Sequence, residues 1–223
     1  MKIRGAIFDM DGTLLDSLTF WEHFWERTGE RYLGREGFRP PEDLDRRVRT
    51  MLYADAMRAV HRECGISSPC EEFLAYAKEA LSDFYRTVAR PKAGAVALLS
   101  TLCERGIPLC LASASAPEEV GFVLCHHGLA PYFSEVLSCT EVGVGKDRPD
   151  IYLLAAERLR LSPSDVAVVE DSYVALETAR RAGFRTVGVY DRNNYGWDRL
   201  RAAADRYLPE GEPLDTLLAF FAE

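Results

Sequence analysis

The sequence predicts an α/β fold, in which a doubly wound, Rossmann-like parallel sheet carries an inserted all-helical cap domain. From residue 91 onward, short apolar runs alternate with helical patterns, and such alternation implies parallel strands joined by crossover helices. Between residues 16 and 90 the apolar residues recur at helical spacing only. The expected core domain is therefore formed by 1–15 and 91–223, and the expected cap domain by 16–90.

The first expected strand ends abruptly in acidic residues. The apolar segment from Ile3 to Phe8 indicates a buried strand, and Asp9, Asp11 and Gly12 follow it directly. Side chains of an extended segment alternate between two faces, so Asp9 and Asp11 point the same way. Because two like charges held close together repel, a metal ion or a positive side chain is expected beside them.

The inserted segment resembles a small helical bundle. Pro40 and Pro41 mark one turn, and the stretch 65–69 marks another. Trp21 and Trp25 are expected to belong mainly to the core of this bundle, although Trp21 is close enough in sequence to Asp9 and Asp11 to face a substrate. The apolar residues that set the helical period include Leu18, Phe24, Leu44, Val48, Val60, Phe73, Ala77, Leu81 and Phe84.

Ligands of open parallel sheets lie beyond the carboxyl ends of the strands, so each later strand end is a candidate site. The expected strand 108–112 is followed by Ser113 and Ala114, where a hydroxyl and free backbone N–H groups at a helix N-terminus can bind an anion. Ser115 and Glu118 also have the spacing of a capping box, and both interpretations can hold together.

Two further strand ends carry charged residues. The expected strand 135–138 leads to a glycine-containing loop with Lys146 just before a helix start. The expected strand 166–169 ends in Glu170 and Asp171. Lys146 alone could be a surface charge, and Asp171 alone could be a helix N-cap. Their positions directly after strands favour a functional site.

Taken in order, the strand ends supply a carboxylate pair, a hydroxyl, a lysine and a second carboxylate pair. This order resembles the four motifs of the haloacid dehalogenase superfamily of phosphotransferases, and the stretch from Asp9 through Thr13, of the form Asp-x-Asp-Gly-Thr, looks like its first motif. The helical insert is similar to that family's cap of the first type, as in the β-phosphoglucomutase and phosphoglycolate phosphatase subgroup. The resemblance covers nearly the whole chain.

The resemblance implies a phosphoric monoester hydrolase that acts on a small phosphorylated metabolite, such as a sugar phosphate. Asp9 would be the nucleophile that forms an aspartyl-phosphate. Asp11 would protonate the departing alcohol and then activate water. Lys146 and Ser113, with the backbone of Ala114, would hold the transferred phosphate.

The resemblance also implies Mg²⁺ as cofactor. Asp9, the backbone carbonyl of Asp11, and Glu170 or Asp171 would hold the ion, and the choice between the last two stays open. Trp21 and Arg86 are the candidates in the cap for contacting the remote part of the substrate.

Two alternatives stay open. A phosphosugar mutase of the β-phosphoglucomutase type must hold a second phosphate, and those enzymes usually carry a lysine directly after the second motif and a histidine early in the first cap helix. The corresponding positions here read Ala116 and Trp21. A catalytically silent binding or regulatory protein is disfavoured, because every motif acid and Lys146 are present. A dinucleotide-binding enzyme is disfavoured too, since no Gly-x-Gly-x-x-Gly follows the first strand.

The charge and the hydropathy of the sequence limit the classes of partner that are expected. The 223 residues carry a formal net charge of -8, which argues against an extended nucleic-acid footprint. No apolar run approaches the roughly 20 residues of a membrane span, and the N-terminus enters a strand without a signal-peptide pattern. We therefore expect a cytoplasmic protein that acts without a membrane or nucleic-acid partner, as a monomer or weak homodimer.

Overall fold

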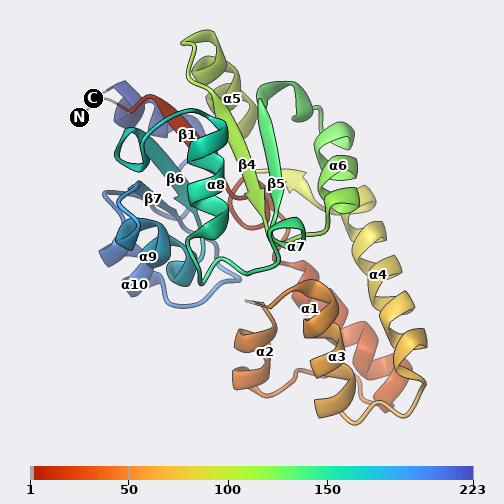
Figure 1. Ribbon diagram of the computed structural model, residues 1–223. Helices are drawn as coiled ribbons and strands as arrows, with labels where there is room; N and C mark the ends of the chain where they lie inside the picture. Colours follow the sequence, from red (N-terminus) through yellow and green to blue (C-terminus); the bar gives the residue numbers. More distant parts are fainter. Residues whose placement is uncertain (1–2, 50, 223) are drawn as a thin grey trace.

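The computed structural model describes residues 3–49 and 51–222, and its centre is a parallel sheet of six strands (Figure 1). The strand order is β5-β4-β1-β6-β7-β8, and every neighbouring pair runs parallel. The predicted doubly wound fold is thereby confirmed. The strands are β1 (Gly5–Phe8), β4 (Leu109–Ser113), β5 (Glu135–Ser138), β6 (Val166–Glu170), β7 (Arg185–Val189) and β8 (Arg206–Leu208).

Strand β1 lies in the middle of the sheet, between β4 and β6, and all four of its residues are buried. Parallel strands that are covered by helices on both faces consist mainly of apolar residues, and for this reason no polar residue interrupts β1. Phe8 packs with α5, α6 and η4 on one face, whereas Ile7 packs with α8 and α9 on the other. These helices are α5 (Ala95–Glu104), α6 (Pro117–His126), α8 (Asp150–Arg158), α9 (Tyr173–Arg181) and the 3₁₀ helix η4 (Leu214–Ala222).

A helical segment lies beyond the carboxyl ends of the strands (Figure 1). It is connected to the sheet through a two-stranded antiparallel ribbon, β2 (Leu15–Asp16) with β3 (Arg90–Pro91). The ribbon falls at the predicted junctions, and the division into two domains stays a prediction. The helices of the segment are α1 (Phe20–Thr28), η1 (Gly29–Leu33), α2 (Glu42–Val48), α3 (Tyr53–Glu63) and α4 (Cys70–Thr87).

Aromatic side chains form the interior of this segment. Phe24 stacks against Tyr76 with ring centroids 6.1 Å apart, and Trp25 is 1% exposed. The indole Nε1 of Trp25 donates a hydrogen bond of 2.7 Å to Asp45, so the buried polar atom is satisfied. The expectation that the tryptophans belong to the bundle core is confirmed for Trp25.

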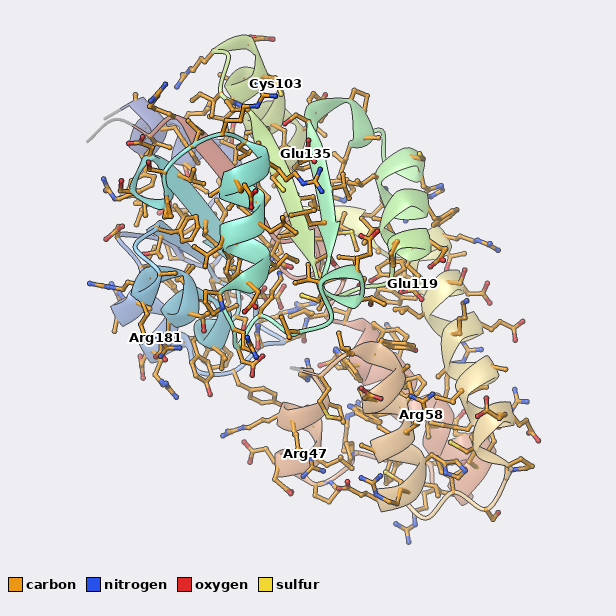
Figure 2. All side chains as sticks on the ribbon, in the orientation of Figure 1. Arg47, Arg58, Cys103, Glu119, Glu135 and Arg181 are labelled. Carbon is orange, nitrogen blue, oxygen red and sulfur yellow. The ribbon has the colours of Figure 1, made fainter. Side chains whose placement is uncertain are left out.

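Two local features differ from the sequence-based expectation. Strand β8 was not expected, because its three residues are too short to show a period. Helix α6 begins at Pro117, and Glu119 accepts a hydrogen bond of 3.2 Å from the backbone N–H of Ala116. The predicted capping pair of Ser115 and Glu118 is therefore wrong by one residue. Glu119 lies in the first turn of α6, on the side of α4 (Figure 2). Within the described ranges, no helix combines the length and apolar character that a bilayer crossing requires.

Candidate active site

The loop that follows β1 places the first two acids at the carboxyl edge of the sheet. The backbone N–H of Asp9 bonds to the carbonyl of Val169 on β6, which continues the ladder into the loop. Gly12 then turns the chain with φ of 79°, and a Cβ at this position would lie 2.3 Å from Asp171 Oδ2. Only glycine permits this approach, so the turn brings the first acidic loop against the end of β6.

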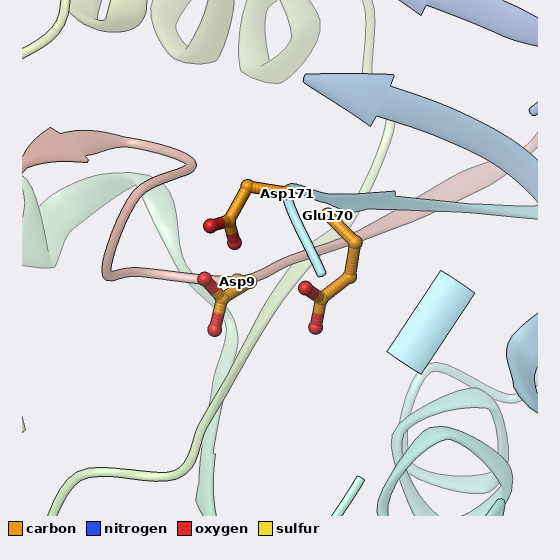
Figure 3. Close-up of side chains that lie close together, drawn as sticks. All are labelled: Asp9, Glu170 and Asp171. Atoms are coloured by element: carbon orange, nitrogen blue, oxygen red, sulfur yellow. The ribbon is translucent and has the colours of Figure 1, made fainter. Parts of the chain in front are cut away.

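Three buried carboxylates meet at this edge. Asp9, Glu170 and Asp171 each offer an oxygen, and these oxygens lie within 4.8 Å of one another (Figure 3). All three residues are buried, and the most accessible of them, Asp9, is 7% exposed. Carboxylate oxygens are the ligands that hard divalent cations prefer, and buried like charges need such a cation. The donor set therefore fits a magnesium-type ion.

Lys146 supplies a positive charge on one side of this cluster. Its Nζ donates hydrogen bonds to Asp9 Oδ1 and, over 2.7 Å, to Glu170 Oε1. Tyr152 donates a further hydrogen bond of 2.8 Å to Glu170 Oε1. Burial opposes the charge on Lys146, but the charges of Asp9 and Glu170 outweigh it and raise its pKa. Burial raises the pKa of Glu170 to about 7, against the opposing effect of Lys146.

Asp171 is in different surroundings from Glu170. It accepts hydrogen bonds from the Thr13 hydroxyl at 3.2 Å and from the Asn194 amide at 2.6 Å, both neutral donors. Burial raises the pKa of Asp171 well above its ordinary value, and the charges of Asp9 and Glu170 add to the effect. Asp171 is thus the acid of the cluster whose charge is least compensated.

The Asp11 carboxylate lies beside the cluster and is held by hydroxyl groups. Ser17 and Tyr85 donate to its Oδ1 over 2.8 Å and 2.9 Å, and Ser115 donates to its Oδ2 over 2.9 Å. Burial raises the pKa of Asp11, and the nearby Asp9 charge adds to this; the hydroxyl donors act in the opposite direction. A carboxyl group that retains its proton more readily is suited to general acid catalysis.

A cavity of about 400 Å³ opens above these acids, between the sheet edge and the helical segment. Most of its surface comes from apolar and aromatic side chains, with Asp9, Asp11 and Lys146 among the polar groups that reach it. The helical segment contributes side chains that include Leu18, Trp21, Arg49, Leu52, Tyr53 and Leu81. A single concave pocket with convergent polar groups is the usual form of a small-molecule site.

Arg49, at the end of α2, is held by an acid of its own helix. Its guanidinium donates two hydrogen bonds to Asp45, of 3.2 Å and 3.0 Å, and the two side chains are only 11% and 10% exposed. Tyr195 donates a hydrogen bond to Asp45, and Arg49 donates one of 2.7 Å to the backbone carbonyl of Asn193. The helical segment is thereby joined to the loop after β7, which also provides Asn194 for Asp171.

The structure brings most of the sequence-predicted site residues to one place. Asp9, Asp11, Lys146, Glu170, Asp171, Ala114 and Trp21 all line the cavity. Ser113 is 1% exposed, and its hydroxyl accepts a hydrogen bond of 3.1 Å from the backbone N–H of Ser115. Its hydroxyl is thus engaged in the turn that precedes α6, and its phosphate-binding role stays a prediction.

The structure does not bring Arg86 to the cavity. Its guanidinium lies over the ring of Phe122 on α6, 5.3 Å from the centroid. Adjacent residues of a helix point about 100° apart, so the preceding residue, Tyr85, faces the site in its place. Tyr85, Ser115 and Asn194 are site residues that sequence reasoning missed. No local pattern marks Tyr85 or Asn194, because each acquires its place through a contact with a distant segment, whereas the local pattern around Ser115 indicated only a helix cap.

Comparison with known proteins agrees with this geometry. The family model described as haloacid dehalogenase-like hydrolase matches residues 3–183. The phosphorylated carbohydrates phosphatase of Thermotoga maritima is 30% identical over 216 residues, which cover 96% of this chain and 98% of that protein. Hexitol phosphatase A of Escherichia coli is 30% identical over 204 residues, covering 85% and 84%. These findings confirm the expected enzyme class, a phosphoric monoester hydrolase.

Solved structures show the same architecture over the full length. A Thermotoga maritima protein assigned as a beta-phosphoglucomutase aligns with a TM-score of 0.78 and 29% identity, covering 98% of this chain and 99% of the other. CbbY from Rhodobacter sphaeroides in complex with phosphate aligns with a TM-score of 0.79 and 22% identity, covering 99% and 100%. The second likeness concerns the fold alone.

Proposed function

The chain belongs to the haloacid dehalogenase-like hydrolases, and from this premise we propose that it is a Mg²⁺-dependent phosphatase of a small sugar phosphate that works through an aspartyl-phosphate. One observation carries the proposal. Asp9 contacts Lys146, Asp11 accepts a hydrogen bond from Tyr85, and the two acids line the same cavity. A nucleophile, a cation and a proton donor are what phosphoryl transfer from an alcohol requires.

In the first step, a carboxylate oxygen of Asp9 attacks phosphorus, and the bond from phosphorus to the alcohol oxygen breaks. Asp11 gives its proton to that departing oxygen. In the second step, water attacks the phosphorus of the aspartyl-phosphate and Asp11 takes a proton from the water. The bond between phosphorus and the Asp9 oxygen breaks, which restores the Asp9 carboxylate and releases inorganic phosphate. Lys146 reduces the repulsion between the Asp9 carboxylate and the phosphate.

Asp9, the backbone carbonyl of Asp11, and Asp171 would hold Mg²⁺. When bound, the ion supplies charge neutralisation for a carboxylate and a phosphate that approach each other. Glu170 has the separate task of fixing Lys146, since its Oε1 already accepts hydrogen bonds from Lys146 and Tyr152. Residues 16–90 would act as the cap that excludes water and selects the substrate.

The phosphatase names of the relatives that are 30% identical support a phosphorylated carbohydrate as the substrate.

The mutase is the second candidate, favoured by the structural likeness to a protein assigned as a beta-phosphoglucomutase. A mutase needs cationic groups for a second phosphate. Arg49 is the most deeply placed arginine of the cavity wall, and Asp45 already neutralises it. Arg199 is paired with Glu177. These pairs favour a monophosphate and hence hydrolysis.

We expect inorganic phosphate to be released from β-glucose 1-phosphate or from another member of a panel of sugar and polyol phosphates, in the presence of Mg²⁺. The assay follows glucose 6-phosphate and inorganic phosphate together, with a trace of glucose 1,6-bisphosphate present. The physical reason is that the two arginines which the described part of the helical segment contributes to the cavity wall, Arg46 and Arg49, are already paired with Glu42 and Asp45. Rapid isomer formation with little phosphate release would replace the phosphatase with the mutase.

A further inference from the structure

Tyr85 joins the helical segment directly to the carboxylate of Asp11. It lies near the end of α4, is 3% exposed, and donates a hydrogen bond of 2.9 Å to Asp11 Oδ1. Its oxygen also lies 3.3 Å from the Ser115 hydroxyl, which donates to Asp11 Oδ2. Both oxygens of Asp11 are therefore in contact with one connected set of hydroxyl groups.

The three donors come from three different parts of the chain. Ser17 lies in the link between the ribbon and α1, Ser115 follows β4, and Tyr85 belongs to the helical segment. Tyr85 is the donor that depends on the helical segment being in place over the sheet. The phenol keeps its proton, because burial and the neighbouring charge of Asp11 raise the pKa of Tyr85 well above its usual value.

We propose that Tyr85 is a positioning residue for proton transfer: its O–H holds the Asp11 carboxyl in its orientation and stabilises the carboxylate that forms when Asp11 protonates the departing alcohol. The proposal rests on the proposed phosphatase function. No proton leaves Tyr85 in this step. A hydrogen bond to an ionised carboxylate is stronger than one to its neutral form, so the contact strengthens as the proton leaves Asp11.

The inference assigns to the helical segment a part in the chemistry as well as in enclosing the substrate. If the segment moves away from the sheet, Asp11 loses one of the two donors to its Oδ1 and keeps Ser17 and Ser115. Proton transfer is therefore most favoured when the segment lies over the substrate. A general acid that is completed by closure would couple the breaking of the phosphate ester bond to an enclosed substrate.

The test is Tyr85→Phe, assayed with two substrates in the same preparation. One is the best aliphatic phosphate ester of the panel, whose alkoxide must be protonated as it leaves, and the other is p-nitrophenyl phosphate, whose phenolate leaves without that help. We expect kcat/KM for the aliphatic ester to fall at least about tenfold, as for loss of one hydrogen bond to a charged group. We expect kcat/KM for p-nitrophenyl phosphate to fall less than about threefold.

Tyr76→Phe is the matched control, since Tyr76 also lies on α4, is 7% exposed and is not part of the cavity wall. It should leave both values near those of the wild type. Any partly unfolded fraction lowers both kcat/KM values equally, so their ratio reports on Asp11 alone.

Equal losses on the two esters, or no loss on either, would overturn the role of Tyr85. A wild-type protein that hydrolyses neither ester would instead refute the proposed function, so the two failures are distinguishable.

Discussion

Asp9→Asn is expected to abolish turnover while leaving the fold intact. An amide oxygen is too weak a nucleophile to form the aspartyl-phosphate, so kcat should fall by at least about 10³-fold. The exchange preserves shape, and Lys146 keeps its hydrogen bond of 2.7 Å to Glu170. It also removes one of three like charges that lie within 4.8 Å of one another. The melting temperature should therefore stay close to that of the wild type.

Phosphate release and thermal melting measure the two parts of this prediction. Mass spectrometry of acid-quenched wild-type enzyme adds a direct observation, because the phosphoryl adduct should be found on the peptide that contains Asp9. Asp83→Asn is the matched control, as Asp83 is an exposed acid of α4 outside the cavity wall. Near-normal turnover in Asp9→Asn, or an adduct on another peptide, would remove Asp9 from the role of nucleophile.

The sequence was most informative where a strand ends in a charged residue. Buried parallel strands are mostly continuous runs of apolar residues, so the change from Phe8 to Asp9, directly after β1, and from Val169 to Glu170, the last residue of β6, marks the edge where ligands bind. Because β1 and β6 are neighbours in the sheet, the two acidic ends had to meet. The carboxylate cluster follows from this topology alone.

The sequence was less informative where a side chain is positioned by rotation about a helix or by a distant loop. Arg86 was a candidate because a phosphate site favours a cation, but the helix turns Tyr85 toward Asp11 and Arg86 toward Phe122. Asn194 contacts Asp171 from a loop 23 residues later in the chain. Such contacts depend on the packing of separate elements, which leaves no period or spacing in the sequence.

Mg²⁺ is expected to be necessary for activity and to stabilise the folded protein. Chelation should silence phosphate release, and added Mg²⁺ should restore it. At a concentration about 100 times its Kd, an ion that binds only the folded state adds about 2.7 kcal/mol to the free energy of unfolding. The melting temperature should rise accordingly, because the ion offsets the repulsion among Asp9, Glu170 and Asp171.

Asp171→Asn and Glu170→Gln distinguish the two acids at the end of β6. Among the residues that the structure describes, the Asp171 carboxylate accepts hydrogen bonds from the neutral donors Thr13 and Asn194, so its charge is the one left for the ion. Asp171→Asn should therefore abolish the rise in melting temperature. Glu170 is committed to Lys146, so Glu170→Gln should keep a substantial part of that rise. Without Mg²⁺, Asp171→Asn loses a buried like charge but also loses one of the two oxygens that accept from Thr13 and Asn194, so its melting temperature should stay near that of the wild type.

Calorimetric titration with Mg²⁺ checks the affinities independently of turnover, and the expected loss of affinity is larger for Asp171→Asn than for Glu170→Gln. The reverse order would exchange the roles of the two acids, with Glu170 as the ligand and Asp171 as the structural partner of Asn194. Activity that persists after exhaustive chelation, together with a melting temperature that does not respond to Mg²⁺, would exclude the metal from the mechanism. Lys146 would then be the charge that allows the Asp9 carboxylate to approach a phosphate.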